Sequence, residues 1–357
     1  METILYLMHI NWNWIKQRPQ FIAEGLSEKY EVCILYKHLY KTNGYQKTKT
    51  NLKNIKLREV YGLPNRLNKY TTFNSINIWL FRRKVKKIIA KKAPKCIYIT
   101  GPSLFRAIPK QYKGKVIYDC MDDHLALHKD PNDYEVRDER QLVKRANNIV
   151  ITSNHLEQVI LKRYGTENQK KISVVRNGFS GKILNNINKG VSNNKIVYFG
   201  TISHWLDFSM LEKSLDDFQN IEYDLYGPID DTLQLPNNPR IHFLGTVEHN
   251  ELPKIAQNSL ALMMPFKVND IIKSVDPVKL YEYINFDKNI ICVKYPEILR
   301  FNDFVYFYNN YSEYKKIISK ILENNCIKYS EKQRINFLKN NRWNNRVNDI
   351  FKIIENH

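Results

Sequence analysis

The sequence has no long hydrophobic run. No apolar stretch approaches the roughly 20 residues that a membrane-spanning helix needs. The amino terminus also lacks the basic segment and apolar stretch of a secretion signal, because Met1 to Thr3 leads directly into a predicted strand. We therefore expect a cytoplasmic protein.

Cysteines are few, and none of the five forms a CxxC pair, which disfavours a zinc or redox motif of that type. Four of them lie inside apolar, strand-like runs, so we expect buried, reduced thiols of a cytosolic protein. A GxSxG motif is also absent, which argues against a serine hydrolase of that class. We predict no metal ion and no other cofactor.

Acidic residues are scarce compared with basic ones. The chain has 56 Lys and Arg against 36 Asp and Glu, a formal net charge of +20. The excess is concentrated between Lys37 and Lys95, where 17 basic residues stand against the single acid Glu59. Such a segment permits binding to an anionic partner, either a membrane surface or nucleic acid.

Residues 74–92 within this basic segment predict an amphipathic helix. Its apolar side is expected to hold Ile78, Trp79, Val85 and Ile89, with Arg and Lys around the rest. Basic amphipathic helices with aromatic residues are typical of membrane surfaces, and we predict docking on the anionic inner leaflet of the cell membrane. The alternative is a helix that covers the core and turns a solvated basic face outward.

Strands alternate with helices along nearly the whole chain, which predicts parallel sheets covered on both faces. At 357 residues the chain exceeds one ordinary core. The fold class is therefore α/β, with two doubly wound Rossmann-like domains facing a cleft. The expected boundaries are an acceptor-binding domain at 1–180, a polar linker at 181–194, a donor-binding domain at 195–335 and a C-terminal helix at 336–357.

The segment 274–293 predicts a binding site for a sugar diphosphate. Pro277 suits the first turn of a helix, and Lys279 and Glu282 are three residues apart, so they share one face. A cation, a carboxylate and free amides at a helix N-terminus suit a diphosphate and its sugar. The alternative is a surface ion pair between the two side chains.

Four predicted strand ends come before this helix in the chain. They lie at 198–202, 225–228, 241–245 and 262–266. Together with the pattern P-x-K-x-x-E they resemble the donor half of GT-B glycosyltransferases. The resemblance implies a nucleotide-sugar donor, a UDP- or GDP-sugar, in which Gly200 lets backbone amides approach phosphate and Trp205 either stacks on the nucleobase or packs. The donor-binding residues it implies are Gly200, Thr201, Trp205, Gly227, Pro277, Lys279, Leu280 and Glu282.

The chain departs from that pattern at two places. Ser274 stands where many retaining members carry a second Glu, and no Lys or Arg occurs from Thr201 to Asp207, where many carry a basic pair. The choice between retention and inversion therefore stays open.

In the first half of the chain, a predicted strand ends at three acidic residues, Asp119, Asp122 and Asp123. Clustered carboxylates raise one another's pKa, and one can then act as a general base. We favour Asp122 as the base, with Asp123 second and Asp119 holding the loop by accepting backbone hydrogen bonds. The alternative is a capped turn before the next helix.

Other motifs of the first half are 9–12, 17–20 and 175–178. They resemble bacterial GT-B enzymes of polysaccharide assembly, of the family-4 and teichuronic-acid types, and more distantly a xanthan glucuronosyltransferase. In those enzymes a C-terminal helix, here with Arg342, Trp343 and Arg346, packs back on the first domain. His9 is a second acid/base candidate, or a buried structural histidine. The acceptor-binding candidates are Trp12, Trp14, Arg18, Asp119 and Asn177, with the two tryptophans either stacking on sugars or packing.

These expectations combine into a glycosyltransferase that moves a sugar to a lipid-linked or growing glycan in capsule, exopolysaccharide or cell-wall polymer synthesis. A non-catalytic glycan- or membrane-binding scaffold with the same fold is the alternative. A nucleic-acid binder is a further alternative, although the basic segment lacks regular aromatic interleaving and a known module.

Overall fold

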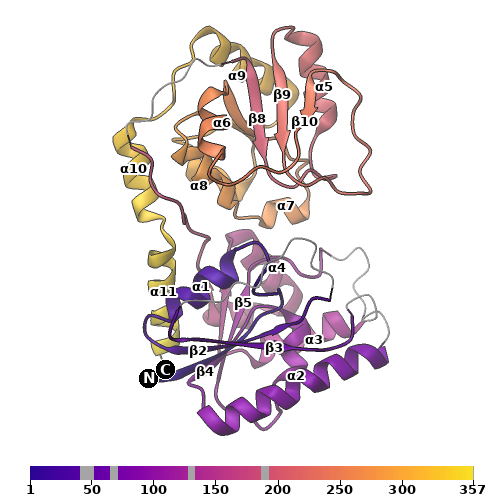
Figure 1. Ribbon diagram of the computed structural model, residues 1–357, viewed down its shortest axis with the longest axis vertical. Coiled ribbons are helices and arrows are strands. Elements are labelled where there is room, and N and C mark those ends of the chain that lie inside the picture. Colours follow the sequence, from indigo (N-terminus) through magenta and orange to yellow (C-terminus); the bar gives the residue numbers. More distant parts are fainter. Residues whose placement is uncertain (41–51, 65–70, 128–132, 186–192, 357) are drawn as a thin grey trace. The chain divides into compact units, whose positions relative to one another are not determined.

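The computed structural model describes residues 1–40, 52–64, 71–127, 133–185 and 193–356. The chain forms two compact units, one of Met1–Asn177 with Trp343–His357 and one of Gly178–Arg342. Each unit contains its own sheet with helices packed against it (Figure 1).

The first unit is built on a seven-stranded sheet with the order β3-β2-β1-β4-β5-β6-β7. Every neighbouring pair is parallel, as the alternating sequence pattern predicts. The strands are β1 (Thr3–Leu7), β2 (Glu31–Lys37), β3 (Ile55–Val60), β4 (Cys96–Ile99), β5 (Lys115–Cys120), β6 (Asn148–Ile151) and β7 (Ile172–Val174). The helices of this part of the chain are α1 (Arg18–Leu26), α2 (Thr71–Lys92), α3 (Asp133–Arg145) and α4 (Asn154–Tyr164), with 3-10 helices at Pro102–Ala107 and Thr166–Lys171.

The second unit repeats the plan with six parallel strands in the order β10-β9-β8-β11-β12-β13. The strands are β8 (Lys195–Phe199), β9 (Glu222–Tyr226), β10 (Ile241–Phe243), β11 (Ala261–Met264), β12 (Asn289–Val293) and β13 (Tyr306–Tyr308). The helices are α5 (Phe208–Asp217), α6 (Leu252–Asn258), α7 (Asp270–Ser274), α8 (Val278–Asn285), α9 (Tyr311–Glu323) and α10 (Glu331–Asn340), with a 3-10 helix at Pro296–Phe301. Two doubly wound α/β units confirm the predicted fold class.

The predicted C-terminal helix is in fact two helices. The first, α10, ends at Asn340, and α11 (Trp343–Glu355) belongs to the first unit. There α11 packs on α1: the rings of Trp343 and Phe21 stack with centroids 4.9 Å apart. Trp343, Val347, Ile350 and Phe351 are buried in the same cluster as the β1 and β2 side chains. The chain therefore returns to its first unit, as the resemblance implies.

Helix α2 corrects one sequence-based expectation. Its inner side holds Asn74, Asn77, Ile78, Phe81 and Val85, which are all buried. Trp79 does not share that side, because 56% of its surface is exposed. The helix therefore has two apolar sides, one packed on the sheet and one outward.

Four of the five cysteines, Cys33, Cys96, Cys120 and Cys292, are buried and free, and Cys326 is exposed. This confirms the prediction of buried, reduced thiols. Among the described residues, no helix combines the length and the hydrophobicity that a membrane crossing requires.

Candidate active site

In the first sheet the strand order reverses between β1 and β4. Parallel α/β sheets bind ligands at the carboxyl ends of strands at such a reversal. His9 follows β1 and Thr100 follows β4, and the His9 Nδ1 atom lies 2.7 Å from the Thr100 hydroxyl oxygen. A cavity of about 470 Å³ opens at this edge, lined among others by His9, Lys37 and His124.

His9 is neutral at physiological pH. Burial, and to a lesser degree the neighbouring His124 ring at 5.4 Å, lowers the pKa of His9 to about 3. Thr100 Oγ accepts from the His9 backbone N–H and donates weakly to the Leu7 carbonyl. This pattern favours Nδ1 as the protonated ring nitrogen, so Nε2 keeps its lone pair. With a pKa of about 3, however, His9 is a weak base.

Asp119, at the end of β5, is fully buried in an ion pair. Arg18 Nε lies 2.9 and 3.1 Å from its two carboxylate oxygens, and both side chains are closed to solvent. The same guanidinium donates to the Val175 carbonyl at 2.8 Å and to the Asn177 amide oxygen at 3.4 Å. The carboxylate is thus held by a side chain, and not by backbone amides as expected. Arg18, Asp119 and Asn177 tie three segments together, and we interpret them as residues that position the site.

Asp123 has a partner of its own. The Arg163 guanidinium binds both of its oxygens at 2.5 and 2.6 Å, and the Ala126 N–H donates to it at 3.2 Å. The carboxylate is therefore committed to an ion pair and to the turn that follows it. This arrangement matches the capped-turn alternative for Asp123.

Asp122 lies between these two residues. Its backbone carbonyl accepts from the Cys120 thiol at 3.4 Å, but its carboxylate has no hydrogen bond to any described residue. Burial, reinforced by the nearby Asp119 and Asp123 charges, raises the pKa of Asp122 to about 6, while Arg18 opposes the shift. A partly buried carboxylate with a pKa near neutrality is suited to accept a proton. Of the three carboxylates, Asp122 has the environment of a base.

The two tryptophans of the first loop differ. Trp12 is 7% exposed and packs in the core, whereas Trp14 is 44% exposed. Asn11 holds this loop, because its amide group donates to the Lys37 carbonyl at 2.8 Å and accepts from the Asn13 N–H at 2.9 Å. Packing is therefore the role of Trp12, and sugar stacking by Trp14 stays a prediction.

In the second sheet the order reverses between β8 and β11, and Gly200 follows β8. Its backbone adopts φ +145°, and Gly227, after β9, adopts φ +147°. A Cβ on Gly227 would lie 2.0 Å from the Gly200 carbonyl oxygen, so only glycine allows the two loops to touch. The Gly200 N–H donates to the Tyr226 carbonyl at 2.8 Å. This amide is thus used inside the sheet, and Thr201 is the exposed residue beside it.

Lys279 reaches over Gly200 from helix α8. A Cβ on Gly200 would lie 2.2 Å from Lys279 Cε and 2.7 Å from its Nζ. Burial lowers the pKa of Lys279, an effect that Glu282 partly opposes. The ammonium therefore lies at the reversal point of the second sheet, close to the uncapped first turn of α8, whose N-cap is Pro277.

Glu282 does not form an ion pair with Lys279 at contact distance. Its Oε1 lies 3.0 Å from Nε2 of His249, in the loop after β10. This contact is the first cause of the raised pKa of His249. The alternative of a surface ion pair between Lys279 and Glu282 is therefore wrong, and Glu282 joins α8 to a second loop.

Two further donor candidates have structural contacts. Trp205 is half-buried, and its indole shares a hydrogen bond with Tyr198, which favours packing over stacking on a base. The Leu280 side chain is fully buried in the core of this unit. Any contact of Leu280 with a donor would thus come from its backbone.

Sequence reasoning missed several residues at these two places. Lys37, Thr100, His124, Arg163 and His249 all contact or line the sites described above. For Thr100 the signal was available, since it precedes Gly101 at a strand end. Single charged residues in loops, such as His249, carry no pattern that distinguishes them from surface residues.

Glu222, Asp224 and His242 could in principle hold a metal ion, because their ligand atoms lie within 4.8 Å of one another. The Lys195 ammonium lies 3.0 Å from Asp224 Oδ2 and 3.7 Å from Glu222 Oε2. A cation already neutralises this cluster, so these residues do not fit a metal site.

Two doubly wound α/β units, each with polar residues gathered at the reversal of its strand order, define the fold class of the GT-B glycosyltransferases. Solved structures agree. Sucrose-phosphate synthase from Thermosynechococcus elongatus superposes with a TM-score of 0.72 at 11% identity, covering 99% of this chain and 98% of its own. HepE of Anabaena, in complex with UDP and glucose, gives a TM-score of 0.70 at 14% identity, with 99% of both chains covered.

Among curated proteins, the chain is distantly related to one described as "Putative teichuronic acid biosynthesis glycosyltransferase TuaH" of Bacillus subtilis (strain 168). The two are 22% identical over 309 residues, which cover 76% of each. No protein-family model matches the chain. The predicted resemblance to GT-B enzymes and to the teichuronic-acid type is thereby confirmed.

Proposed function

We propose that this protein transfers a sugar from a nucleotide-sugar to a lipid-linked or growing glycan. The observation that carries the proposal is the Lys279 ammonium over Gly200, at the strand-order reversal of the second sheet. A cation beside an uncapped helix start and a glycine loop suits a nucleoside diphosphate, UDP or GDP. The complex of HepE with UDP and glucose supports a donor of this class on this fold.

The reaction assigns a distinct task to each group. The bond between the anomeric carbon and the diphosphate oxygen breaks, and the acceptor oxygen bonds to that carbon. Lys279 stabilises the negative charge on the departing diphosphate. In an inverting transfer Asp122 takes the proton of the acceptor hydroxyl, and His9 Nε2 is the second candidate. The cavity beside His9 holds the acceptor.

The product belongs to a cell-surface polymer such as a capsule, an exopolysaccharide or a teichuronic-acid-like chain. The relationship to TuaH, whose name refers to teichuronic acid biosynthesis, supports this context. A polymer of this kind is assembled on a lipid carrier, so its enzyme works at the inner face of the cell membrane.

Helix α2 supports a peripheral membrane position. Phe73, Ile76 and Trp79 are exposed at three-residue spacing, and Arg83 and Lys86 continue the same stripe. Apolar side chains followed by basic ones fit the boundary of an anionic bilayer. Trp79→Ala should lower co-flotation with phosphatidylglycerol vesicles several-fold. Unchanged flotation would argue against docking through this stripe.

The donor proposal is tested by thermal unfolding with UDP, GDP, other nucleoside diphosphates and their sugars. A ligand at 100 times its Kd stabilises the folded protein by about 2.7 kcal/mol. The shift should disappear in Lys279→Ala and persist in Lys316→Ala, an exposed lysine of α9. If no nucleotide raises the melting temperature of the wild-type protein, the donor site is refuted.

A further inference from the structure

A second cavity in the first unit lies apart from the candidate active site. It has a volume of about 480 Å³ and opens between the edge strand β3, its neighbour β2 and the C-terminal half of α2. Its lining comes from Glu31 and Cys33, in the first half of β2, and from Lys56 and Arg58 of β3. The acceptor cavity lies at the carboxyl ends of the strands, by the N-terminal half of α2. The two cavities therefore occupy opposite ends of the same sheet.

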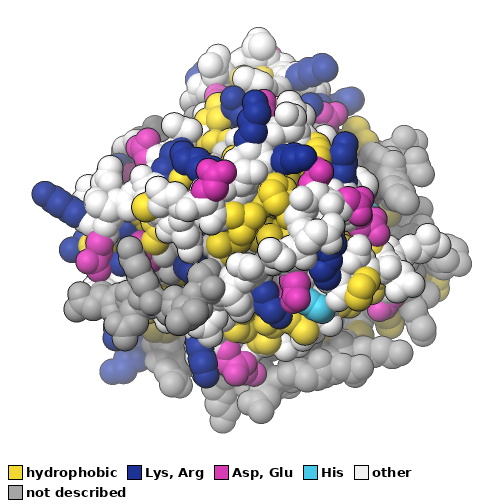
Figure 2. All heavy atoms as spheres, turned by 90° about the horizontal axis from the view of Figure 1, so that it is seen from above, with side chains coloured by type: hydrophobic (Ala, Val, Ile, Leu, Met, Phe, Trp, Pro, Cys, Tyr) yellow, Lys and Arg dark blue, Asp and Glu magenta, His cyan; other side chains and the backbone are white. Residues whose placement is uncertain are grey.

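This second cavity is strongly positive. Among the described residues that line it, Glu31 is the one acidic side chain, and the six basic ones are Lys56, Arg58, Lys84, Lys87, Lys91 and Lys92. The face of the molecule in Figure 2 differs, because there basic side chains are interspersed with acidic and hydrophobic ones. Like charges gathered in a partly enclosed space repel one another, and a bound anion removes that repulsion.

Most of the charge in the cavity is not neutralised by the protein. Lys92 pairs with Glu31 at 2.9 Å, and Lys84 donates to the Glu59 backbone carbonyl at 2.5 Å. The side chains of Lys87 and Lys91 form no ion pair or hydrogen bond with any described residue. At least two ammonium groups are thus available to a ligand.

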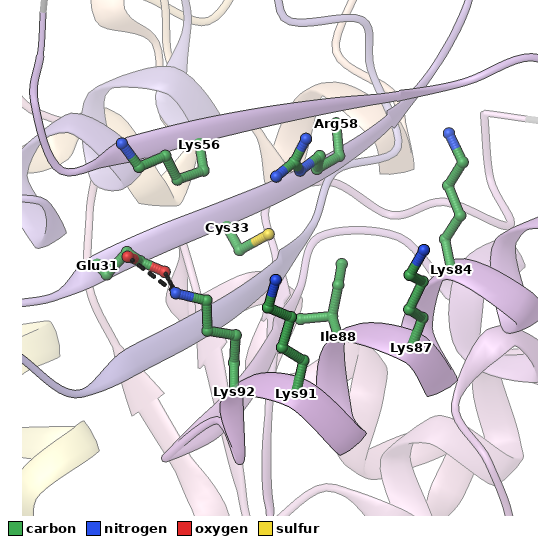
Figure 3. Close-up of a pocket in the computed structure, with 9 residues that line it drawn as sticks. All are labelled: Glu31, Cys33, Lys56, Arg58, Lys84, Lys87, Ile88, Lys91 and Lys92. Atoms are coloured by element: carbon green, nitrogen blue, oxygen red, sulfur yellow. Dashed lines mark hydrogen bonds and ion pairs between the residues drawn. The ribbon is translucent and has the colours of Figure 1, made fainter.

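The side chains come from two sides of the cavity. Figure 3 shows Lys56 and Arg58 on the strand and Lys84, Lys87 and Lys91 rising from the helix, with Cys33 and Ile88 between them. Arg58 lies close enough to the Cys33 thiol to oppose the rise in its pKa that burial causes. A guanidinium and several ammonium groups thus surround the neutral side chains of Cys33 and Ile88. This arrangement suits a compact ligand with more than one negatively charged group.

We propose that this cavity binds two or more adjacent phosphate groups, independently of the nucleotide-sugar site. The ligand chemistry can come from a diphosphate-bearing lipid headgroup at a membrane or from a soluble oligophosphate. Two neighbouring phosphates present enough charge to engage cations on both walls, which a single phosphate does less well. The proposal does not depend on the proposed transfer reaction, because none of its residues belongs to the candidate active site.

The test compares two variants that lose the same charge in the same unit. Lys87→Gln with Lys91→Gln removes cations that line the cavity. Lys162→Gln with Lys170→Gln removes two exposed cations that neither line the cavity nor belong to α2. Both variants should keep the wild-type melting temperature, since all four side chains are exposed.

The probes are inorganic tripolyphosphate, followed by calorimetry, and vesicles of phosphatidylcholine with either cardiolipin or phosphatidylglycerol at equal total charge. Cardiolipin carries two phosphates in one headgroup. At about 0.15 M salt, where diffuse surface attraction is screened, we expect wild-type protein to bind tripolyphosphate, cardiolipin vesicles, or both. Binding to one probe alone identifies the soluble or the lipid source.

The cavity variant should lose about tenfold or more in affinity, because each charge-assisted contact contributes substantially, and the control variant about twofold or less. Equal losses in the two variants would show diffuse attraction and overturn the proposal. Failure of the wild-type protein to bind either probe would also overturn it. Neither result would affect the nucleotide-induced thermal shift, which depends on Lys279.

Discussion

Three carboxylates that lie within five residues of one another have three different environments. Asp119 is paired with Arg18, which is 101 residues away in the chain, and Asp123 with Arg163, 40 residues away. Asp122 has neither partner. The sequence could gather these residues at one strand end, but it could not separate their roles. The separation depends on which arginine the fold brings to which carboxylate.

Replacing Asp122 by Asn should reduce transfer and increase stability. Loss of a general base lowers turnover by about 100-fold or more. The pKa of Asp122 rises from 3.8 to about 6 on folding, so its charge destabilises the folded protein at pH 7 by on the order of 2 kcal/mol. Turnover is measured as nucleoside diphosphate release in the presence of acceptor, and stability by urea unfolding.

The matched control is Asp123→Asn, which leaves Arg163 without its carboxylate. A buried charge-assisted pair is lost, so stability should fall by about 2 kcal/mol. The two variants thus move stability in opposite directions. Full turnover in Asp122→Asn would rule out Asp122 as the base.

The pH dependence follows from the same shift. The folded state holds the Asp122 proton more tightly than the unfolded state does. This group therefore favours folding most at low pH, and its contribution is lost as pH rises through about 6. Turnover should change in the opposite sense, because it should rise as the base ionises through about pH 6. In Asp122→Asn this dependence of turnover on pH should be absent.

At the scale of the elements, the contact between α1 and α11 is close enough to need a glycine. A Cβ on Gly25 would lie 2.3 Å from Cγ2 of Val347. Gly25→Ala gains about 1 kcal/mol of helix propensity, but overpacking of a core costs about 1 to 3 kcal/mol. We therefore expect net destabilisation of about 1 kcal/mol by urea unfolding.

The free energy of unfolding of the double variant Gly25→Ala with Val347→Ala tests this contact against the two single variants. The new methyl group then occupies space that Val347 vacates, so the double variant should be more stable than the sum of the single changes by about 1 kcal/mol. Strict additivity would show that the two helices do not touch at this place.

Much of this element-level organisation follows from sequence pattern. The alternation of apolar strands with helices predicts both parallel sheets, and Asp207 is recognisable as the start of α5, where its side chain accepts from the Met210 N–H at 3.3 Å. The break between α10 and α11 at Asn341 was not predictable, because no Pro or Gly marks it. Strand β13 was also missed, because three residues carry too little periodicity. Trp79 was misplaced because Asn74 and Asn77 take buried positions that apolar residues normally fill.

At the scale of the whole molecule, the chemistry is divided between two units that each have a separate core. The proton-accepting candidates, His9 and Asp122, belong to the first unit, and Lys279 and Glu282 to the second. His9 follows β1, at the reversal of the first sheet, and Asp122 follows β5, the next strand beyond β4. In the second unit, Lys279 reaches from α8 over Gly200, which follows β8 at the reversal of the second sheet. The position of both sites is thus a consequence of the winding of the chain, and the residue types at each site decide what it binds.

This division predicts how hydrogen exchange responds to a donor nucleotide. UDP at 100 times its Kd adds about 2.7 kcal/mol to the free energy of unfolding of the unit that binds it. The slowest amides of β8 and β11 should therefore exchange about 100-fold more slowly, while those of β1 and β4 keep their rates, because the first unit has its own core. Lys279→Ala should abolish the slowing in β8 and β11, and Lys316→Ala should not. Slowing of equal size in both sheets would mean that the two units open as one, and slowing confined to β1 and β4 would place the donor in the first unit.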